Sequence, residues 1–343
     1  MLDNKCRPIV ETGPVFDGSR PIVTCEDGPT VAPVDPVEPV NPIVPDPAKL
    51  CTPQPNVECC TAVGGVIIAP VDNLCTCGFS VLGAGVDDNK TFTPSSGFLI
   101  ITENNAVIDC IDHTGCILIR ANNVTIRNSI IDCDSTAPGI RQEALYTGAV
   151  IEGNTIIGGP MGTGAGVSGG NMTVVGNEIR GTVDGIQVTD GNTLIEGNYI
   201  YNLFDTILPG GGISHNDNIQ VLNGSNITIN KNVMISEISP SHNSVVFAQS
   251  DFGPISNLTV SNNYVVAAGW TIRFNNDVTG FIIDNTVGVS PLPQFGPILV
   301  SGGSSAVVSC NVWESGAVIA EGGNTCIGTP TAIRFDDLSE CKC

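Results

Sequence analysis

Basic residues are scarce in this sequence. Its 343 residues include only 13 lysines and arginines against 34 aspartates and glutamates, which gives a formal net charge of −21. Such a chain repels the phosphates of nucleic acids and of anionic lipids, so we expect neither as a partner. The acidity also argues against an anionic substrate unless a cation bridges the two, although it can attract divalent cations themselves.

Long apolar runs are absent as well. No stretch reaches the roughly 18 apolar residues that a membrane-spanning helix needs, so we predict no membrane span. No signal peptide is visible at Met1, and we expect one to have been removed. The chain instead has 40 glycines and 23 prolines. Val, Ile, Asn, Thr and Gly dominate from about residue 98 onward, a composition that favours strands and turns over helices.

The 14 cysteines are missing from the middle of the chain, residues 134–309. Their close pairs, Cys75-Thr-Cys77 and Cys341-Lys-Cys343, have one intervening residue, which is not the spacing of zinc knuckles. We therefore predict up to seven disulfides, located near the two ends of the chain and absent from its middle. Disulfides indicate an oxidising compartment, so we expect an extracellular or cell-surface protein.

Three segments lie outside the repeat described next. Residues 1–50 have proline at about every third position, which predicts an extended polyproline II arm. This arm is either a stiff linker or a segment that packs on another copy of the chain. Residues 51–97 are rich in cysteine and predict an N-terminal cap, because a solenoid must cover its first coil. Residues 321–343 predict a cysteine-containing C-terminal cap.

Residues 98–320 contain a repeat whose marker is Asn, any residue, then an apolar residue after a short β run. A period of 21 to 34 residues with such short strands predicts an all-β solenoid in which stacked coils bury a continuous core. We expect the marker asparagines to hydrogen-bond from coil to coil and to occupy left-handed turns. The markers are Asn128, Asn154, Asn177, Asn198, Asn232, Asn263, Asn285 and Asn311.

A second strand precedes each of the later markers. Because side chains alternate along a strand, its middle residue should face outward, which predicts that Gln187, Gln220 and Arg273 share one outer face. The five segments are Ile186-Gln-Val, Ile219-Gln-Val, Val245-Val-Phe, Ile272-Arg-Phe and Ile298-Leu-Val.

Two coils resemble those of the pectate-lyase-like superfamily. They are Thr182-Val-Asp-Gly-Ile-Gln-Val with Asn192-Thr-Leu-Ile-Glu-Gly-Asn-Tyr-Ile, and His215-Asn-Asp-Asn-Ile-Gln-Val with Ser225-Asn-Ile-Thr-Ile-Asn-Lys-Asn. The resemblance covers roughly residues 98–320. It implies a right-handed parallel β-helix with a carbohydrate-facing groove. The superfamily includes polysaccharide lyases, glycoside hydrolases, epimerases, virion tail spikes and surface proteins, so the resemblance specifies no single activity.

The two longest coils are adjacent and carry insertions at about 203–216 and 236–257, where functional residues usually gather. Strand alignment stacks Asp184 under Asp217 and places Asn243 next, with Gln187 and Gln220 beside them. The carboxylate pair has three interpretations. It acts as an acid and base on a glycosidic bond, it binds Ca²⁺, or each Asp caps the turn that enters a strand. Ca²⁺ is the one cofactor that we consider.

The same alignment sets His242 beside Asn216, close to His215, which makes both histidines candidate acid–base groups. Two loop histidines that bond only to backbone carbonyls are the alternative. His113 lies far from this region. Arg273 is the best-placed basic residue for a lyase, ahead of Arg180, Lys231 and Arg141. The chain lacks the paired Asp beside Gly-His-Gly and the Arg-x-Pro-x-x-Arg that mark polygalacturonases and pectate lyases.

These observations support two functions. The first is an extracellular protein that binds or processes polysaccharide, with Asp184, Asp217, His215, His242 and Arg273 as catalytic candidates and Gln187, Gln220 and Asn243 as substrate-binding candidates. The second is a non-catalytic subunit of a surface filament that assembles through residues 1–50. Six N-glycosylation sequons overlap the repeat in part, at Asn89, Asn123, Asn171, Asn223, Asn226 and Asn257.

Overall fold

The computed structural model describes residues 84–86, 92–159, 164–207, 211–237, 241–320 and 323–326. The Pro-rich arm, residues 51–83 and 87–91 of the expected N-terminal cap, and residues 327–343 lie outside this set. Within it, all regular elements are strands, and no helix is long and apolar enough to cross a membrane.

The strands form three parallel sheets, and the chain visits them in a fixed order, A, then B, then C, in every coil. Sheet A contains β1 (Thr93–Ser96), β4 (Ile111–Thr114), β7 (Ile130–Cys133), β10 (Thr155–Gly158), β13 (Glu178–Arg180), β16 (Tyr199–Tyr201), β19 (Val233–Ile235), β22 (Tyr264–Val266), β25 (Thr286–Val287) and β28 (Val312–Trp313). Sheet B contains β2 (Leu99–Ile101), β5 (Ile117–Ile119), β8 (Ile140–Gln142), β11 (Val167–Gly169), β14 (Ile186–Val188), β17 (Asn216–Val221), β20 (His242–Gln249), β23 (Trp270–Asn275) and β26 (Gly296–Val300). Sheet C contains β3 (Val107–Asp109), β6 (Thr125–Arg127), β9 (Ala149–Glu152), β12 (Met172–Val175), β15 (Thr193–Glu196), β18 (Gly224–Asn230), β21 (Ile255–Ser261), β24 (Val278–Ile283) and β27 (Ser305–Ser309).

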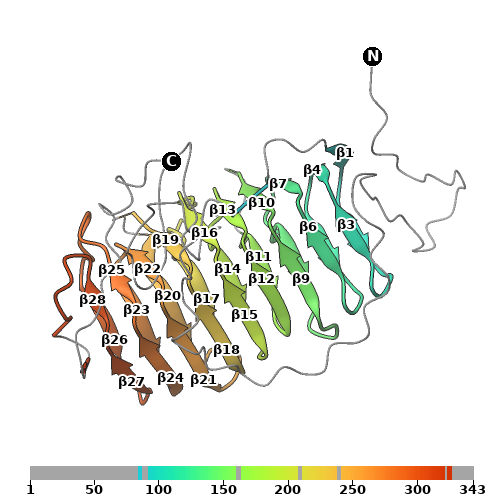
Figure 1. Ribbon diagram of the computed structural model, residues 1–343. Coiled ribbons are helices and arrows are strands. Elements are labelled where there is room, and N and C mark those ends of the chain that lie inside the picture. Colours follow the sequence, from blue (N-terminus) through green and yellow to red (C-terminus); the bar gives the residue numbers. More distant parts are fainter. Residues whose placement is uncertain are drawn as a thin grey trace, which may run out of the picture.

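Each strand pairs with the strands one coil before and after it, so the chain is a parallel β-helix, as predicted (Figure 1). It has the right-handed crossover that parallel strands favour. Columns of Ile and Val from all three sheets fill the interior. In sheet B the inward column includes Ile186, Ile219, Val246 and Ile272, all fully buried.

The marker asparagines form a buried ladder at the corner between sheets C and A. The backbone N–H and the side-chain amide of Asn177 both donate to Oδ1 of Asn198, each over 2.9 Å. The Asn177 amide also donates to the Ile151 carbonyl of the preceding coil. The same bonds recur from Asn154 to Asn311, so the predicted coil-to-coil role is confirmed.

Two details of the ladder differ from the prediction. Asn128 is not a member, because Ser129 stands in register with Asn154 and accepts the Ile111 N–H in its place. In the ladder the left-handed backbone belongs to the residue before each asparagine, such as Lys231 with φ of 53°, whereas the predicted marker Asn128 is itself left-handed with φ of 50°.

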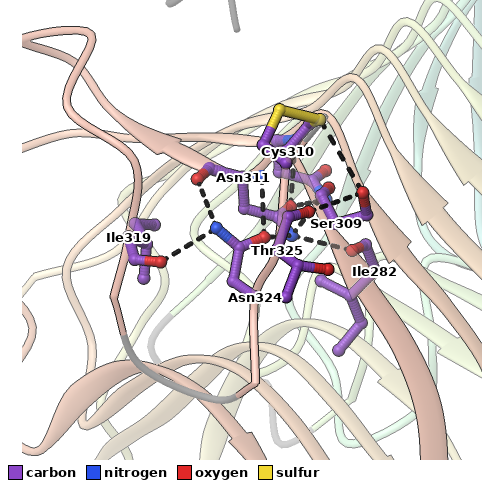
Figure 2. Close-up of a disulfide and its surroundings, with 9 residues drawn as sticks. Ile282, Ser309, Cys310, Asn311, Ile319, Asn324 and Thr325 are labelled. Atoms are coloured by element: carbon purple, nitrogen blue, oxygen red, sulfur yellow. Dashed lines mark hydrogen bonds between the residues drawn. A yellow bond between two sulfur atoms is a disulfide. The ribbon is translucent and has the colours of Figure 1, made fainter. Parts of the chain in front are cut away.

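The C-terminal end of the ladder is closed by residues 323–326 (Figure 2). Asn324 accepts the Asn311 N–H and donates to the Asn311 and Ile319 carbonyls. The Cys310–Cys326 disulfide joins this segment to the last coil. A second disulfide, Cys116–Cys133, joins two of the first coils, so the prediction of disulfides near both ends is confirmed for the described residues.

Residues 84–86 lie against the side of the β-helix and not across its end. The Gly85 N–H donates to the Gly176 carbonyl over 2.8 Å, and the Val86 N–H donates to the Thr155 hydroxyl over 3.2 Å. This part of the segment expected to form the N-terminal cap therefore contacts its own sheet A.

A ladder variant tests the dependence of the fold on buried amides. Asn198→Asp keeps the shape but removes the donor, and we expect it to lower the free energy of unfolding at neutral pH by roughly 3 kcal/mol or more. The matched control is Asn192→Asp. Asn192 belongs to an exposed ladder and donates to Asn171. Loss of this hydrogen bond should lower the free energy of unfolding by under about 1 kcal/mol. Equal losses in denaturant titrations would contradict this account.

Removal of the C-terminal disulfide tests the closure of the ladder. The bridge spans a sequence separation of 16, so the Cys310→Ser, Cys326→Ser double variant should be less stable by about 3 kcal/mol. We expect hydrogen exchange to rise at the amides of Cys310 and Thr325, which bond to this segment, before it rises in β14 or β15. Uniform loss of protection along the rod would show that the bridge does not act locally.

Candidate functional site

The corner between sheets A and B is the irregular part of the β-helix. The two insertions leave the regular coil here, between β16 and β17 and between β19 and β20. The second is shorter than the predicted 236–257, because β20 already begins at His242 and β21 at Ile255. Ile207 and Ile213 pair as an antiparallel bridge, so the first insertion doubles back on itself. The strands that follow the insertions, β17 and β20, lie side by side in sheet B between β14 and β23 (Figure 1).

Asp184 and Asp217 stack at this corner, as predicted, and each carboxyl group accepts a backbone N–H from the next coil. The Asp217 N–H donates to Asp184 Oδ1 over 2.9 Å, and the Ser244 N–H donates to Asp217 Oδ1 over 2.8 Å. Asp217 is fully buried and Asp184 is 8% exposed. These contacts agree with the interpretation in which each Asp caps the turn that enters a strand. The carboxyl oxygens accept backbone N–H groups from the next coil, as the amide oxygens of the asparagine ladder do.

Burial makes both carboxyl groups hard to ionise. It raises the pKa of Asp184 to about 7. Burial, together with the negative charge of Asp184, raises the pKa of Asp217 well above its ordinary value. A protonated carboxyl group is a poor cation ligand. Within the described ranges, no three His, Cys, Asp or Glu side chains gather around a point where a metal ion could sit. Because Asp217 is fully buried and Oδ1 of each Asp already accepts a backbone N–H, the two carboxyl groups do not fit Ca²⁺.

Asn243 does not follow Asp217 in the column, and this part of the prediction is wrong. Asn216 pairs with His242 but Asp217 pairs with Ser244, so Asn243 is the extra residue of a β-bulge. The inward strand residue is accordingly Val246 and not Val245. The bulge directs Asn243 toward its neighbours. Its amide donates to Asp217 Oδ1 over 3.2 Å, and its own Oδ1 accepts from Arg273 Nη1 over 3.3 Å.

Gln187, Gln220 and Arg273 share the outer face of sheet B, as predicted. Gln187 donates to Gln220 over 2.8 Å, and Phe247 occupies the row between Gln220 and Arg273. The Arg273 guanidinium lies over the Phe247 ring, 5.1 Å from its centre. Asn243 and Phe247 therefore fix the position of Arg273. Arg141 stands further along the same row.

Arg180 and Lys231 lie elsewhere and contact carboxylates of their own. Arg180 of sheet A pairs with Glu178 over 3.2 Å, and Lys231 at the corner between sheets C and A pairs with Glu196 over 3.5 Å. His113 is in register with Ile131 and points into the core near the N-terminal end. The structure therefore separates these three residues from the candidate site.

The two histidines of the insertions differ. His215 is exposed, whereas His242 is buried and binds both insertions. His242 Nδ1 accepts the Glu237 N–H over 3.0 Å, and Nε2 lies 3.2 Å from Asp205 Oδ1. Burial lowers the pKa of His242 below its ordinary value, against the opposing charges of Asp205 and Glu237. His242 is thus a neutral structural group near neutral pH.

Two aromatic residues at the edge of this face are absent from the sequence prediction. Trp270 begins β23 in register with Ser244, and its ring centre lies 6.1 Å from that of Phe295, which is 63% exposed. The repeat carries no signal for Phe295, because it lies in a loop. Trp270 precedes the inward Ile272 by two residues, so strand alternation would have placed it with the inward side chains of β23 and not with Arg273.

The described sequons lie mainly on the exposed edge between sheets B and C. The side-chain amides of Asn226 and Asn257 donate along this edge to Asn192 and Asn226. Asn123 and Asn171 occupy the same edge and donate to Asn105 and Asp190, while Asn223 donates to the Thr189 carbonyl. Asn89 lies outside the described residues. Glycosylation at these sites stays a prediction.

No family model and no curated protein matches this sequence. Two solved structures resemble it at 13% sequence identity. The A-module of the mannuronan C-5 epimerase AlgE6 from Azotobacter vinelandii matches 69% of this chain and 60% of its own, with a TM-score of 0.45. A tailspike protein of Escherichia coli bacteriophage HK620, solved with a pentasaccharide, matches 68% of this chain and 44% of its own, with a TM-score of 0.37. The chain therefore spans less than two thirds of either neighbour, and no activity is carried over from them.

The raised pKa of Asp184 gives the protein a characteristic pH dependence. The pKa of Asp184 in the fold exceeds that of an unfolded aspartate. The contribution of Asp184 to the free energy of unfolding is therefore complete below about pH 4 and is lost as the pH rises through about 7. Asp184→Asn keeps the acceptor for the Asp217 N–H without the charge. At pH 8 we expect this variant to be more stable than the wild type by roughly 2 to 4 kcal/mol. Parallel stability profiles of the two proteins between about pH 4 and pH 8 would contradict the assignment.

Proposed function

We propose that this chain is an extracellular protein that binds a neutral polysaccharide along the outer face of sheet B. The observation that carries the proposal is the row on four successive coils in which Gln187, Gln220 and Arg273 are partly exposed, while Phe247 is buried beneath the Arg273 guanidinium. Coils repeat at the strand spacing of about 4.8 Å, so the row offers regularly spaced groups to a polymer whose units also repeat.

The chemistry of the row suits sugar hydroxyls. Glutamine amides donate and accept hydrogen bonds and a guanidinium group donates them, and neither requires a charged ligand. Trp270 and Phe295 add aromatic surface at the edge of the row, onto which the apolar face of a pyranose ring can pack. The net charge of −21 repels a polyuronate, which favours a neutral glycan.

Binding is favoured over cleavage by the state of the carboxyl pair. Paired acids in glycosidases must reach the scissile bond. Here Asp217 is fully buried, and Oδ1 of each Asp already accepts a backbone N–H. The two disulfides support the extracellular location, because they persist in oxidising compartments. Assembly into a filament would depend on residues 1–50, outside the described residues.

Affinity electrophoresis in laminarin, xylan and dextran, with polygalacturonate as the anionic comparison, tests this proposal. We expect retardation by a neutral polymer, and roughly tenfold weaker binding for Gln220→Ala and for Arg273→Ala, because each variant loses hydrogen bonds to the glycan. Arg180→Ala is the matched control, since this arginine stands on sheet A. Failure of every neutral polymer to bind, or equal weakening by all three variants, would refute the proposal.

The same samples separate binding from processing. On the binding proposal, incubation of the wild-type protein with each polymer releases no reducing ends and no unsaturated products. Products that the wild type releases and Asp217→Asn does not release would establish cleavage by the carboxyl pair instead.

A further inference from the structure

His242 connects the two insertions through contacts of both of its ring nitrogens. Asp205 belongs to the insertion between β16 and β17, whereas Ser236 and Glu237 belong to the one between β19 and β20. His242 Nδ1 contacts the Ser236 hydroxyl over 2.6 Å and the Glu237 N–H over 3.0 Å, and Nε2 faces Asp205 over 3.2 Å. The imidazole is 3% exposed.

These contacts specify the position of the proton on the ring. A backbone N–H can only donate, so Nδ1 must carry a lone pair to accept from Glu237. The single proton of the neutral ring therefore lies on Nε2, where it is donated to Asp205 Oδ1. A second proton on Nδ1 would face the Glu237 N–H, and two donors would then point at each other.

We propose that His242 is a pH-sensitive latch: its neutral Nδ1 accepts the Glu237 N–H, whereas a protonated Nδ1 donates to the Ser236 hydroxyl instead and releases Glu237. The described ionisable groups that act on the ring are the carboxylates of Asp205 and Glu237. Asn216 of β17, its partner in register, is neutral, and Gly269 of the next coil contributes only a backbone bond to the His242 carbonyl. Asp205 keeps its contact after protonation, so release is confined to the Nδ1 side.

The latch also bears on the proposed glycan face, a consequence that rests on the proposed function. Asn243 follows His242 directly and accepts from Arg273 Nη1. Movement of the loop that ends at His242 would loosen Asn243 and, through it, Arg273. Acidification should therefore weaken glycan binding as well as open the loop.

Amide hydrogen exchange tests the latch without any glycan. From about pH 7.5 to about pH 5 we expect the Glu237 amide to exchange roughly tenfold faster relative to its intrinsic rate, with amides of β14 unchanged. His242→Asn places Oδ1 near the position of Nδ1 and does not titrate in this range, so its Glu237 protection should be independent of pH. His215→Asn is the matched control and should keep the wild-type response, since His215 is exposed.

Two results would overturn the latch. One is equal Glu237 protection of the wild type at both pH values, and the other is a pH response that survives in His242→Asn. If that variant does not fold, ¹⁵N shifts of the wild-type ring decide, because Nε2 must carry the proton near neutral pH and Glu237 must open in step with ring protonation. Loss of laminarin affinity at about pH 5 in the wild type but not in His242→Asn would extend the latch to glycan binding. If laminarin affinity changes with pH equally in the wild type and in His242→Asn, the latch acts on the loop alone and not on glycan binding.

Discussion

The structure depends on one requirement, that each buried polar group at a corner finds its hydrogen-bond partner in the next coil. A short strand cannot satisfy the backbone where the chain turns, and the side chains that fill the interior are mainly apolar. Asparagine meets this requirement at the corner between sheets C and A, because its amide both donates and accepts. Asn154, Asn177, Asn198 and their successors thus provide the vertical bonds that keep the coils in register.

The candidate site is a variation on the same device. At the corner between sheets A and B, the carboxyl groups of Asp184 and Asp217 accept backbone N–H groups from the next coil, as asparagine oxygens do elsewhere. A carboxyl group donates only when it is protonated. Burial raises the pKa of both groups, and the charge of Asp184 raises that of Asp217 further. The β-bulge at Asn243 follows directly, and it connects this buried column to Arg273 on the outer face. An irregularity in the ladder thereby positions a side chain on the surface.

The sequence predicts much of this arrangement, because periodic features follow from strand alternation and from the spacing of the markers. The solenoid, the buried asparagines and the shared face of Gln187, Gln220 and Arg273 could all be predicted in this way. Features that break the period could not. The bulge at Asn243 shifts the strand by one residue, which exchanges the inward and outward sides, and pattern alignment assumes that no residue is inserted. Ser129 replaces an asparagine because its hydroxyl accepts the same N–H group, while the adjacent Asn128 carries the marker. The contact between His242 Nε2 and Asp205 Oδ1 depends on the geometry of a loop, which the repeat pattern does not specify.

The central claim is that the outer face of sheet B binds a neutral glycan without cleaving it. The most direct measurement is a crystal structure of the protein with an oligosaccharide of the neutral polymer that binds it most tightly. The account predicts an intact oligosaccharide that contacts Gln187, Gln220 and Arg273, with a pyranose ring against Trp270 or Phe295. An oligosaccharide bound on sheet A or sheet C, or one found cleaved above Asp217, would contradict it.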